Sequence, residues 1–319
     1  MICNFCYRHC DIKEGGEGFC RIRKVKDNKL FSSGYGFLEA IAMDPVEKKP
    51  LYHFLPGTQT LSVAEAGCNY RCEFCQNWQL SQSQKSNNST YVSPKELVNL
   101  ALKYKAPSIS FTYSEPIVWQ DYVIDTAILA KIKGIKTIMV TNGSFSKESR
   151  EKLGTLIDAF NIDLKGDSDY YKTICKSKIE PVLDGIEYLV KVGCHVEVTT
   201  LLIEGIHTKK IVQDLGKALK ERGVKVWHLT RFFPNYKMND RSSTSEKFLF
   251  DMITTAKESG IPYIYGGNTS LSDSTFCPNC GKMLISSHKG DVNIKEECKE
   301  HLKNGKCKKC QTSIYGVFE

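Results

Sequence analysis

The sequence predicts an α/β protein, a partial (β/α)6 barrel of the TIM type with a small cysteine-rich metal module near each end. Three observations support this fold class. Strand and helix signals alternate from about residue 60 to residue 267, most of the 14 cysteines fall into three groups, and 319 residues suffice for one large domain with small appendages. We expect an N-terminal metal-binding segment and lead-in over 1–58, the barrel over 59–270 and a C-terminal module over 271–319.

The predicted strands are short apolar runs, several of them rich in β-branched residues. Such runs favour strands that are buried on both faces, as in a parallel sheet covered by helices. Because parallel barrels gather their chemistry at the C-terminal ends of the strands, polar residues there are the candidate site. The predicted strands are 61–64, 108–112, 136–141, 160–164, 195–203, 224–229 and, shorter, 262–265.

The intervening helices carry recognisable start and stop signals. Ser93 is a predicted cap, Pro94 occupies the first turn, and Glu96 stands at the capping-box position. Gly134 and Gly223 each follow the end of a helix. The later predicted helices are 117–133, 147–156, 181–192, 208–222 and 245–259.

The composition is that of an ordinary soluble protein, with 41% apolar and 25% charged residues. No run of eighteen apolar residues predicts a membrane span, and the N-terminus lacks a basic-then-apolar signal segment, so we expect a cytoplasmic protein. The net charge of +8 is spread along the chain, which argues against a dedicated nucleic-acid surface.

Cys68, Cys72 and Cys75 form a C-x3-C-x2-C motif. A [4Fe–4S] cluster normally takes four thiolates, so three would leave one iron open to a substrate or cosubstrate. A structural zinc site would need a fourth ligand nearby, and the dozen residues after Cys75 include no Cys, His, Asp or Glu. The motif predicts an open iron–sulfur site, with a structural thiolate site or chance clustering as the alternative.

With Phe74 before the last cysteine, the motif reads C-x3-C-x-aromatic-C and resembles the signature of the radical SAM superfamily. The resemblance implies the radical SAM type of partial barrel and a [4Fe–4S] cluster on Cys68, Cys72 and Cys75. It also implies that S-adenosylmethionine (SAM) chelates the open iron and is cleaved reductively to a 5′-deoxyadenosyl radical. Phe74 would then lie near the cofactor.

The resemblance continues at the ends of the later strands. The family usually carries Gly-Gly-Glu-Pro after the second strand, where this chain has Tyr113, Ser114, Glu115 and Pro116. A carboxylate beside an amino group is favourable because charge-assisted hydrogen bonds are strong. By match with the family, the residues expected around SAM are Glu115, Asn142, Asp163, Lys165, Thr199, His228 and Arg231. Alternatives remain open, since Asn142 can belong to a simple turn and His228 can be structural.

Four cysteines near the N-terminus, Cys3, Cys6, Cys10 and Cys20, predict a closed metal site. Zinc or an auxiliary iron–sulfur cluster would both fit, and the spacing does not choose between them.

Four further cysteines near the C-terminus, Cys277, Cys280, Cys307 and Cys310, form two C-x2-C knuckles typical of a zinc ribbon or a rubredoxin-like site. The metal, zinc or iron, would supply much of the stability of so small a module. The remaining cysteines, Cys175, Cys194 and Cys298, are interpreted as buried spectators.

Residues 43–57, together with the cysteine groups, resemble the radical SAM member of the AmmeMemoRadiSam system, which is related to pyruvate formate-lyase activating enzymes. That resemblance implies AMMECR-like and Memo-like partners and an electron donor such as flavodoxin or ferredoxin. Lys48 and His53 would line the substrate mouth or fix the lead-in.

The sequence therefore predicts a radical SAM enzyme that acts on an unidentified substrate, a small molecule or a protein. One alternative is an activase that makes a glycyl radical in a protein backbone. The other is a non-catalytic metal-binding module of an AMMECR/Memo system, for which the altered Tyr113-Ser114 stretch is the support.

Overall fold

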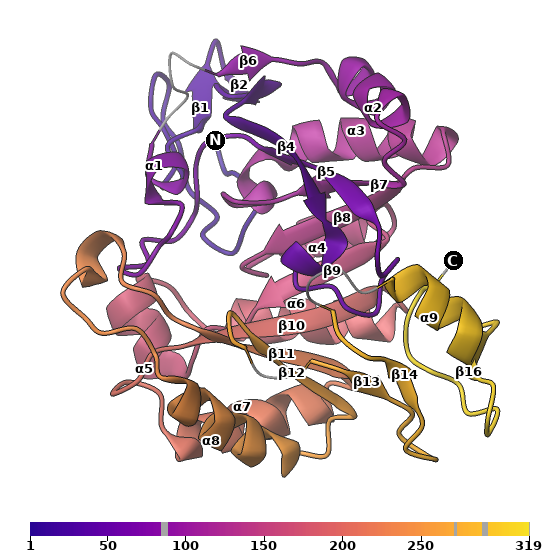
Figure 1. Ribbon diagram of the computed structural model, residues 1–319. Helices are drawn as coiled ribbons and strands as arrows, with labels where there is room; N and C mark the ends of the chain where they lie inside the picture. Colours follow the sequence, from indigo (N-terminus) through magenta and orange to yellow (C-terminus); the bar gives the residue numbers. More distant parts are fainter. Residues whose placement is uncertain (84–88, 271–272, 289–292, 319) are drawn as a thin grey trace.

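The computed structural model describes residues 1–83, 89–270, 273–288 and 293–318. Its centre is a curved eight-stranded sheet in the order β12-β11-β10-β9-β8-β7-β5-β4 (Figure 1). Every neighbouring pair from β5 to β12 is parallel, and only β4 runs antiparallel to its neighbour. The strands are β4 (Ala40–Pro45), β5 (Gln59–Ala64), β7 (Ser108–Phe111), β8 (Lys136–Thr141), β9 (Ala159–Asp163), β10 (His195–Leu202), β11 (Val226–Arg231) and β12 (Tyr263–Gly267).

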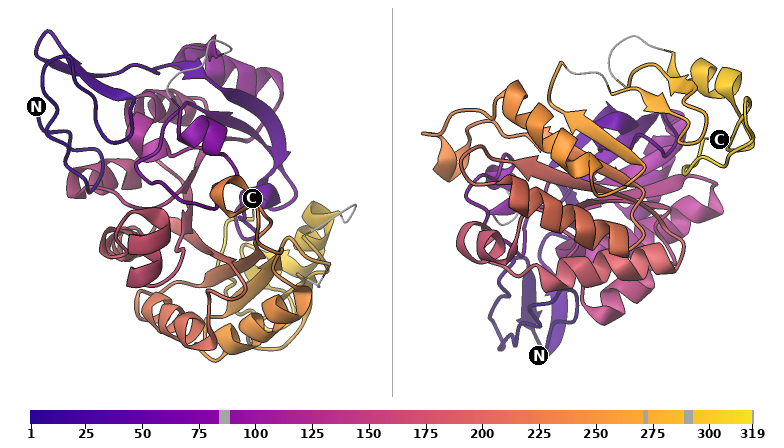
Figure 2. Two further views of the ribbon diagram at one scale, coloured as in Figure 1. Left: turned by 90° about the vertical axis from the view of Figure 1, so that its left-hand side faces the viewer. Right: turned by 90° about the horizontal axis from the view of Figure 1, so that it is seen from below.

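The predicted α/β class and its parallel, open barrel are confirmed. Strands β12 and β4 are the two edges of the sheet, so the barrel does not close. Helices follow the parallel strands and lie along the outer face of the sheet (Figure 2). They are α2 (Pro94–Lys103), α3 (Gln120–Ile132), α4 (Lys147–Gly154), α6 (Glu180–Lys191), α7 (Lys209–Glu221) and α8 (Glu246–Lys257).

The predicted cap of α2 is confirmed in detail. The hydroxyl of Ser93 accepts a hydrogen bond from the backbone of Glu96 at 3.3 Å, and the Glu96 carboxylate accepts one from the backbone of Ser93 at 2.8 Å. The helix predicted from residue 117 instead begins with a 3-10 turn, η2 (Pro116–Trp119), and becomes α-helical at Gln120. The Glu115 carboxylate accepts the hydrogen bond of the Ile117 N–H, which tightens that first turn.

Smaller elements lie outside the barrel or in its loops. They are β1 (Arg23–Lys26), β2 (Lys29–Ser32), β3 (Phe37–Leu38), η1 (Val46–Lys48), α1 (Trp78–Ser81), β6 (Thr90–Tyr91), α5 (Ser168–Tyr170), the π-helical turn η3 (Tyr171–Cys175), η4 (Tyr236–Met238), β13 (Thr275–Phe276), β14 (Met283–Ile285), α9 (Ile294–His301), β15 (Leu302–Lys303) and β16 (Lys306–Cys307). Residues 271–272, 289–292 and 319 of the predicted C-terminal module lie outside the described residues.

The main core lies between the sheet and its helices. Its centre holds fully buried strand residues such as Ile109, Phe111, Ile162 and Leu229. A second apolar cluster joins the C-terminal module to the barrel. No helix among the described residues has both the length and the apolar character that a membrane span requires.

The two ends of the chain lie on different sides of the barrel (Figure 2). Two contacts fasten the C-terminal end. The hydroxyl of Tyr315 bonds both the N–H (2.8 Å) and the carbonyl (3.1 Å) of Val196 in β10. The backbone of Val317 pairs with Leu55 and His53 of the lead-in, at 2.7 and 2.8 Å. The C-terminal module therefore packs directly against the barrel and is hydrogen-bonded to β10 and to the lead-in.

Candidate active site and metal centres

A cavity of about 530 Å³ opens where the parallel strands end. One wall is the loop 68–75 after β5, called here the cluster loop. The other walls are the ends of β7 to β12 and the lead-in residues 47–52. Of the predicted site residues, those that line the cavity are Cys68, Cys72, Phe74, Cys75, Glu115, Asn142, Asp163, Lys165, Thr199 and His228.

Arg231 is not among the lining residues. Its Nε donates to the carbonyl of Thr244 at 2.7 Å, and its Nη1 lies 3.4 Å from the Glu246 carboxylate. The guanidinium therefore ties the end of β11 to the start of α8. Lys48 lines the cavity. His53 instead is fully buried, with its ring nitrogens bonded to the Tyr315 carbonyl and the Tyr265 hydroxyl.

The cluster loop is fixed by its own hydrogen bonds and by a neighbouring turn. The Tyr70 N–H donates to the sulfur of Cys68 at 3.3 Å, and the Ser81 hydroxyl lies 3.2 Å from the sulfur of Cys75. The N–H groups of Arg71 and Glu73 donate to carbonyls of the π-helical turn η3, at 3.0 and 3.2 Å. All three cysteines line the cavity. The loop that carries them is held by hydrogen bonds within itself and to the turn η3.

A fourth thiol lies behind this loop. Cys175, the last residue of η3, is fully buried and lies near Cys72, and the interaction between the two thiols raises the pKa of Cys72. Cys175 does not line the cavity. Sequence reasoning classed it as a spectator, because nothing in the sequence signals that the turn after β9 packs against the cluster loop.

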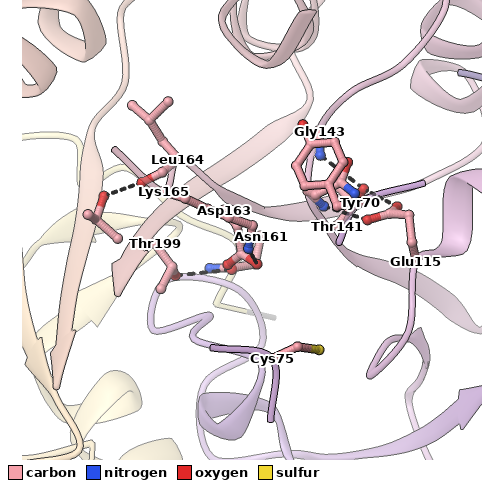
Figure 3. Close-up of polar contacts among 12 residues, drawn as sticks. Tyr70, Cys75, Glu115, Thr141, Gly143, Asn161, Asp163, Leu164, Lys165 and Thr199 are labelled. Carbon is pink, nitrogen blue, oxygen red and sulfur yellow. Dashed lines mark hydrogen bonds and ion pairs between the residues drawn. The ribbon is translucent and has the colours of Figure 1, made fainter. Parts of the chain in front are cut away.

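Glu115 is the buried anchor of the opposite wall (Figure 3). Its carboxylate accepts hydrogen bonds from the Thr141 hydroxyl at 2.6 Å, the Asn142 N–H at 2.7 Å and the Ile117 N–H at 3.1 Å. Burial raises the pKa of Glu115 to about 7, and these hydrogen bonds oppose the rise. Glu115 is thus poised to change charge near neutral pH.

Asn142 belongs both to a turn and to the cavity wall. Its amide nitrogen donates to Asn69 at 2.8 Å, and its amide oxygen accepts from the backbone and hydroxyl of Ser144 at 3.1 and 2.7 Å. Gly143 has a φ of +72°, and a Cβ there would lie 2.6 Å from Ile162. The turn interpretation is therefore confirmed, and the turn also aims Asn142 at the cluster loop, whereas its contact with SAM stays a prediction.

Asp163 and Lys165 form an ion pair of 2.7 Å at the end of β9 (Figure 3). Burial opposes the charged form of Lys165, but the nearby Asp163 and the Cys72 thiol outweigh it and raise the pKa of Lys165. On the neighbouring strand, the Thr199 hydroxyl donates to the Asn161 amide at 3.0 Å. A cation, an anion and a hydroxyl thus share this part of the cavity.

His228 is held from behind by Glu197, a residue that sequence reasoning missed. The Nε2 of His228 lies 2.7 Å and that of His195 3.0 Å from the Glu197 carboxylate, which also accepts the N–H groups of Tyr52 and His53. Burial favours the neutral acid, but the two imidazoles hold the pKa of Glu197 well below its usual range. One signal was available, because His195, Glu197 and Thr199 alternate along β10 and so share a face.

Tyr113 stands where the resembling family has glycine, and its φ of +67° is a left-handed conformation that favours glycine. Its hydroxyl donates to Asp44. The amine of Lys49 lies 2.7 Å from Asp44 and 4.5 Å from the centre of the Tyr113 ring. These buried contacts hold the tyrosine in a backbone conformation that it would otherwise avoid.

The C-terminal cysteines form the most compact thiol group in the described part of the chain. The sulfur atoms of Cys277 and Cys310 lie 3.5 Å apart and those of Cys280 and Cys307 3.8 Å apart, and all four lie within 4.8 Å of one another. Tetrahedral coordination with metal–sulfur bonds of about 2.3 Å would place sulfurs roughly 3.8 Å apart. The group is therefore suited to a single metal ion.

The N-terminal cysteines Cys3, Cys6, Cys10 and Cys20 line a separate small cavity.

Comparisons with known proteins agree with this architecture. The model of the radical SAM superfamily matches residues 65–218. The chain is 39% identical to the uncharacterized protein MJ0808 of Methanocaldococcus jannaschii, over 98% of this chain and 94% of that protein. It is 28% identical to a putative glycyl-radical enzyme activating enzyme of the same organism, over 66% of this chain and 80% of that protein. Among solved structures, Streptococcus suis SuiB bound to S-adenosylmethionine has a similar fold, with a TM-score of 0.54 and 14% identity over 70% of this chain and 53% of SuiB.

The compact C-terminal thiol group leads to a prediction about metal removal. If these thiols hold a metal ion, a metal-specific chelator or the substitution Cys307→Ser should release it and loosen residues 273–288 and 293–318, because the module has little core of its own. We expect new protease cleavage in this module and a fall of the thermal midpoint by about 5 °C or more. The Cys194→Ala variant, altered outside the three cysteine groups, is the control. Unchanged protease resistance in the metal-free protein would contradict the prediction.

Proposed function

The chain belongs to the radical SAM superfamily, and from this premise we propose that Cys68, Cys72 and Cys75 hold a [4Fe–4S] cluster beside which SAM binds in the cavity. When both are bound, reductive cleavage of SAM supplies a 5′-deoxyadenosyl radical that acts on the substrate. The proposal rests on the observation that three cysteines line the same cavity as a carboxylate, an ion pair and a hydroxyl.

The residues present fit such a cluster. Only three cysteines of the cluster loop line the cavity, which leaves the fourth corner of a cubane without a protein thiolate from this loop. The amine of Lys165 lies 5.7 Å from the Phe74 ring, within the cluster loop, where its positive charge would balance thiolates and sulfides.

The opposite wall offers groups for each part of SAM. Two of the three hydrogen bonds to Glu115 end on Oε1 and one on Oε2, so Oε2 keeps a free acceptor position for the amino group. Lys165 is the proposed partner of the carboxylate, and Thr199 that of the ribose hydroxyls. His228, which lines the cavity and is held by Glu197, is the proposed contact of the adenine or the substrate.

The non-catalytic alternative was based on the Tyr113-Ser114 departure. The φ of +67° at Tyr113 is the conformation that a glycine would take there, so the departure leaves the backbone in a shape that glycine favours. This favours the catalytic proposal.

The substrate is proposed to enter beside the lead-in residues Lys48 and Tyr52 and to be a small molecule or a protein segment. Reduction requires a one-electron donor, for which a flavodoxin or a ferredoxin is proposed. Membership of the AmmeMemoRadiSam system and association with AMMECR-like and Memo-like proteins stay predictions of the sequence resemblance.

A second candidate function is the activation of a glycyl radical enzyme. It is supported by the similarity over 66% of this chain to a protein named as a putative activating enzyme of that kind. Incubation with SAM, a reductant and a co-purified protein should then produce a stable glycyl radical detectable by electron paramagnetic resonance. Radical formation on a small molecule alone would argue for the first candidate.

The proposed reaction predicts the products of two incubations. Reconstituted protein, kept anaerobic with dithionite and SAM, should release 5′-deoxyadenosine, and the Cys72→Ala variant should lose this activity by at least about 100-fold because it lacks a cluster ligand. Cys194→Ala should behave like the unchanged protein. Absence of 5′-deoxyadenosine from the unchanged protein with an intact cluster would refute the proposal.

Glu115 predicts a pH dependence of SAM binding. With a pKa of about 7, Glu115 is mostly neutral below pH 7 and charged above it, and the charged form binds the amino group better. The ratio of SAM affinities between the unchanged protein and Glu115→Gln should rise by up to about tenfold per pH unit below pH 7 and level off above it. Calorimetry on cluster-loaded protein measures this ratio, in which the titration of SAM itself cancels. A flat ratio from pH 6 to pH 8 would exclude the assigned role.

Cys175 predicts a change in the reduction potential of the cluster. A polar S–H group near the Cys72 sulfur favours the more negative, reduced cluster, so Cys175→Ala should lower the potential. The hydroxyl of Cys175→Ser should restore part of the shift, whereas Cys194→Ala should cause none. A redox titration followed by electron paramagnetic resonance tests this, and an unchanged potential in Cys175→Ala would contradict it.

A further inference from the structure

The four N-terminal cysteines gather around one cavity. Cys3, Cys6 and Cys20 are buried and Cys10 is half-buried, and all four line the same cavity although up to sixteen residues separate them in the chain. The backbone N–H of Cys3 donates to the carbonyl of Cys10 at 2.9 Å, which closes the first loop. The fold of the N-terminal segment thus serves to bring thiols together.

The N-terminal loop has the dimensions of the cluster loop. Residues 3–10 and residues 68–75 each carry three cysteines within a segment of equal length, with the order of the two gaps exchanged. Cys20 adds a fourth thiol to the N-terminal set, which the cluster loop lacks. The N-terminal set therefore has one thiol for each iron of a cubane cluster.

The spread of the sulfur atoms distinguishes this set from the C-terminal one. Around a single zinc ion, bonds of about 2.3 Å hold all sulfurs roughly 3.8 Å apart. In the described residues, only the C-terminal four form a group of three or more potential ligands within 4.8 Å of one another. The N-terminal thiols and those of the cluster loop are both more widely spaced, as is expected where each thiolate binds a different iron.

A buried cation faces the N-terminal cavity. The Arg23 side chain is 4% exposed, lines the cavity, and lies beside the thiols of Cys3 and Cys20. Its Nη1 pairs with Asp121 at 2.5 Å, but its buried Nε has no hydrogen-bond partner. A buried N–H without an acceptor is costly, and a sulfur atom of an anionic cluster would accept this hydrogen bond.

This cavity lies against the back of the cluster loop. Asn69, from the cluster loop, is one of its lining residues, and Arg8 donates to the Asn69 carbonyl at 2.7 Å. The guanidinium groups of Arg8 and Arg71 lie 3.6 and 4.1 Å from the centre of the Phe19 ring. The two thiol sites therefore share a wall.

We propose that Cys3, Cys6, Cys10 and Cys20 bind a second cubane iron–sulfur cluster, on the side of the cluster loop that Asn69 faces. The site has a full set of four thiolates, so it has no open iron for a substrate. It goes beyond the proposed function, because its occupancy does not depend on SAM or on any reaction in the barrel.

The test counts iron and acid-labile sulfide in the full chain after anaerobic reconstitution. Labile sulfide is diagnostic, because zinc or a single iron at the C-terminal site contributes none. The unchanged protein should hold about eight sulfides per chain, and the triple variant Cys68→Ala/Cys72→Ala/Cys75→Ala about four, that is, half. Adding Cys6→Ala and Cys20→Ala to the triple variant should remove the rest, whereas adding Cys194→Ala should not.

Zinc at the N-terminal site, or a triple variant without labile sulfide, would overturn the proposal. Should the variants fail to fold, Mössbauer spectra of the unchanged protein decide the matter, since two cubane components support the proposal and one overturns it. Two neighbouring reduced clusters should also broaden each other's paramagnetic resonance. Because none of these measurements uses SAM cleavage, a failure of the proposed function would leave the result unaffected.

Discussion

The register of the parallel sheet is the constraint on which the cavity depends. Thr199 of β10 lies opposite Asp163 of β9 on one side and His228 of β11 on the other, so these three side chains form one row across the sheet. All three line the cavity. Because side chains alternate between the two faces of a strand, a slip of one residue would turn such a row away from the cavity. The fully buried neighbours Ile162, Val198 and Leu229 make that slip costly, since they would lose their places in the core.

The cluster loop is ordered by its surroundings rather than by regular structure. The N-terminal segment packs so closely on it that a Cβ at Gly67 would lie 2.9 Å from Ile22 and 3.0 Å from the Cys20 carbonyl. On the other side, the π-helical turn η3 accepts two of its backbone hydrogen bonds. Fixing a loop costs roughly 1–2 kcal/mol per residue in backbone entropy, so contacts made elsewhere in the fold must offset this before a metal arrives. The N-terminal segment therefore supports the loop even if it has no chemistry of its own.

The sequence predicted the parts of the fold that follow from local patterns, and the structure shows why other parts were missed. Apolar runs and capping signals located the parallel strands β5 and β7 to β12 and the cap of α2, because these features are encoded within a few residues. The antiparallel edge strand β4 was missed because its residues are half-exposed, as its pairing with β5 buries only one side. Cys175 was missed because its proximity to Cys72 is a tertiary contact that no local spacing encodes. For Glu197, the alternation along β10 indicates the shared face with His195 and Thr199, but not the contact with His228 on the neighbouring strand. The proximity of the N-terminal thiols to the cluster loop was unpredictable for the same reason.

The C-terminal module and the cavity are linked through Glu197. A buried carboxylate is tolerated only when hydrogen bonds and opposite charges satisfy it, and removing such a partner typically costs 3–5 kcal/mol. Two of its donors are N–H groups of Tyr52 and His53, and His53 is in turn held by the Tyr315 carbonyl of the module. His195 and Tyr315 also stack, with ring centres 4.9 Å apart. Loosening the module would therefore weaken the support of Glu197, and with it the orientation of His228 in the cavity. A metal ion bound by the C-terminal thiols would therefore also help to shape a site to which it contributes no ligand.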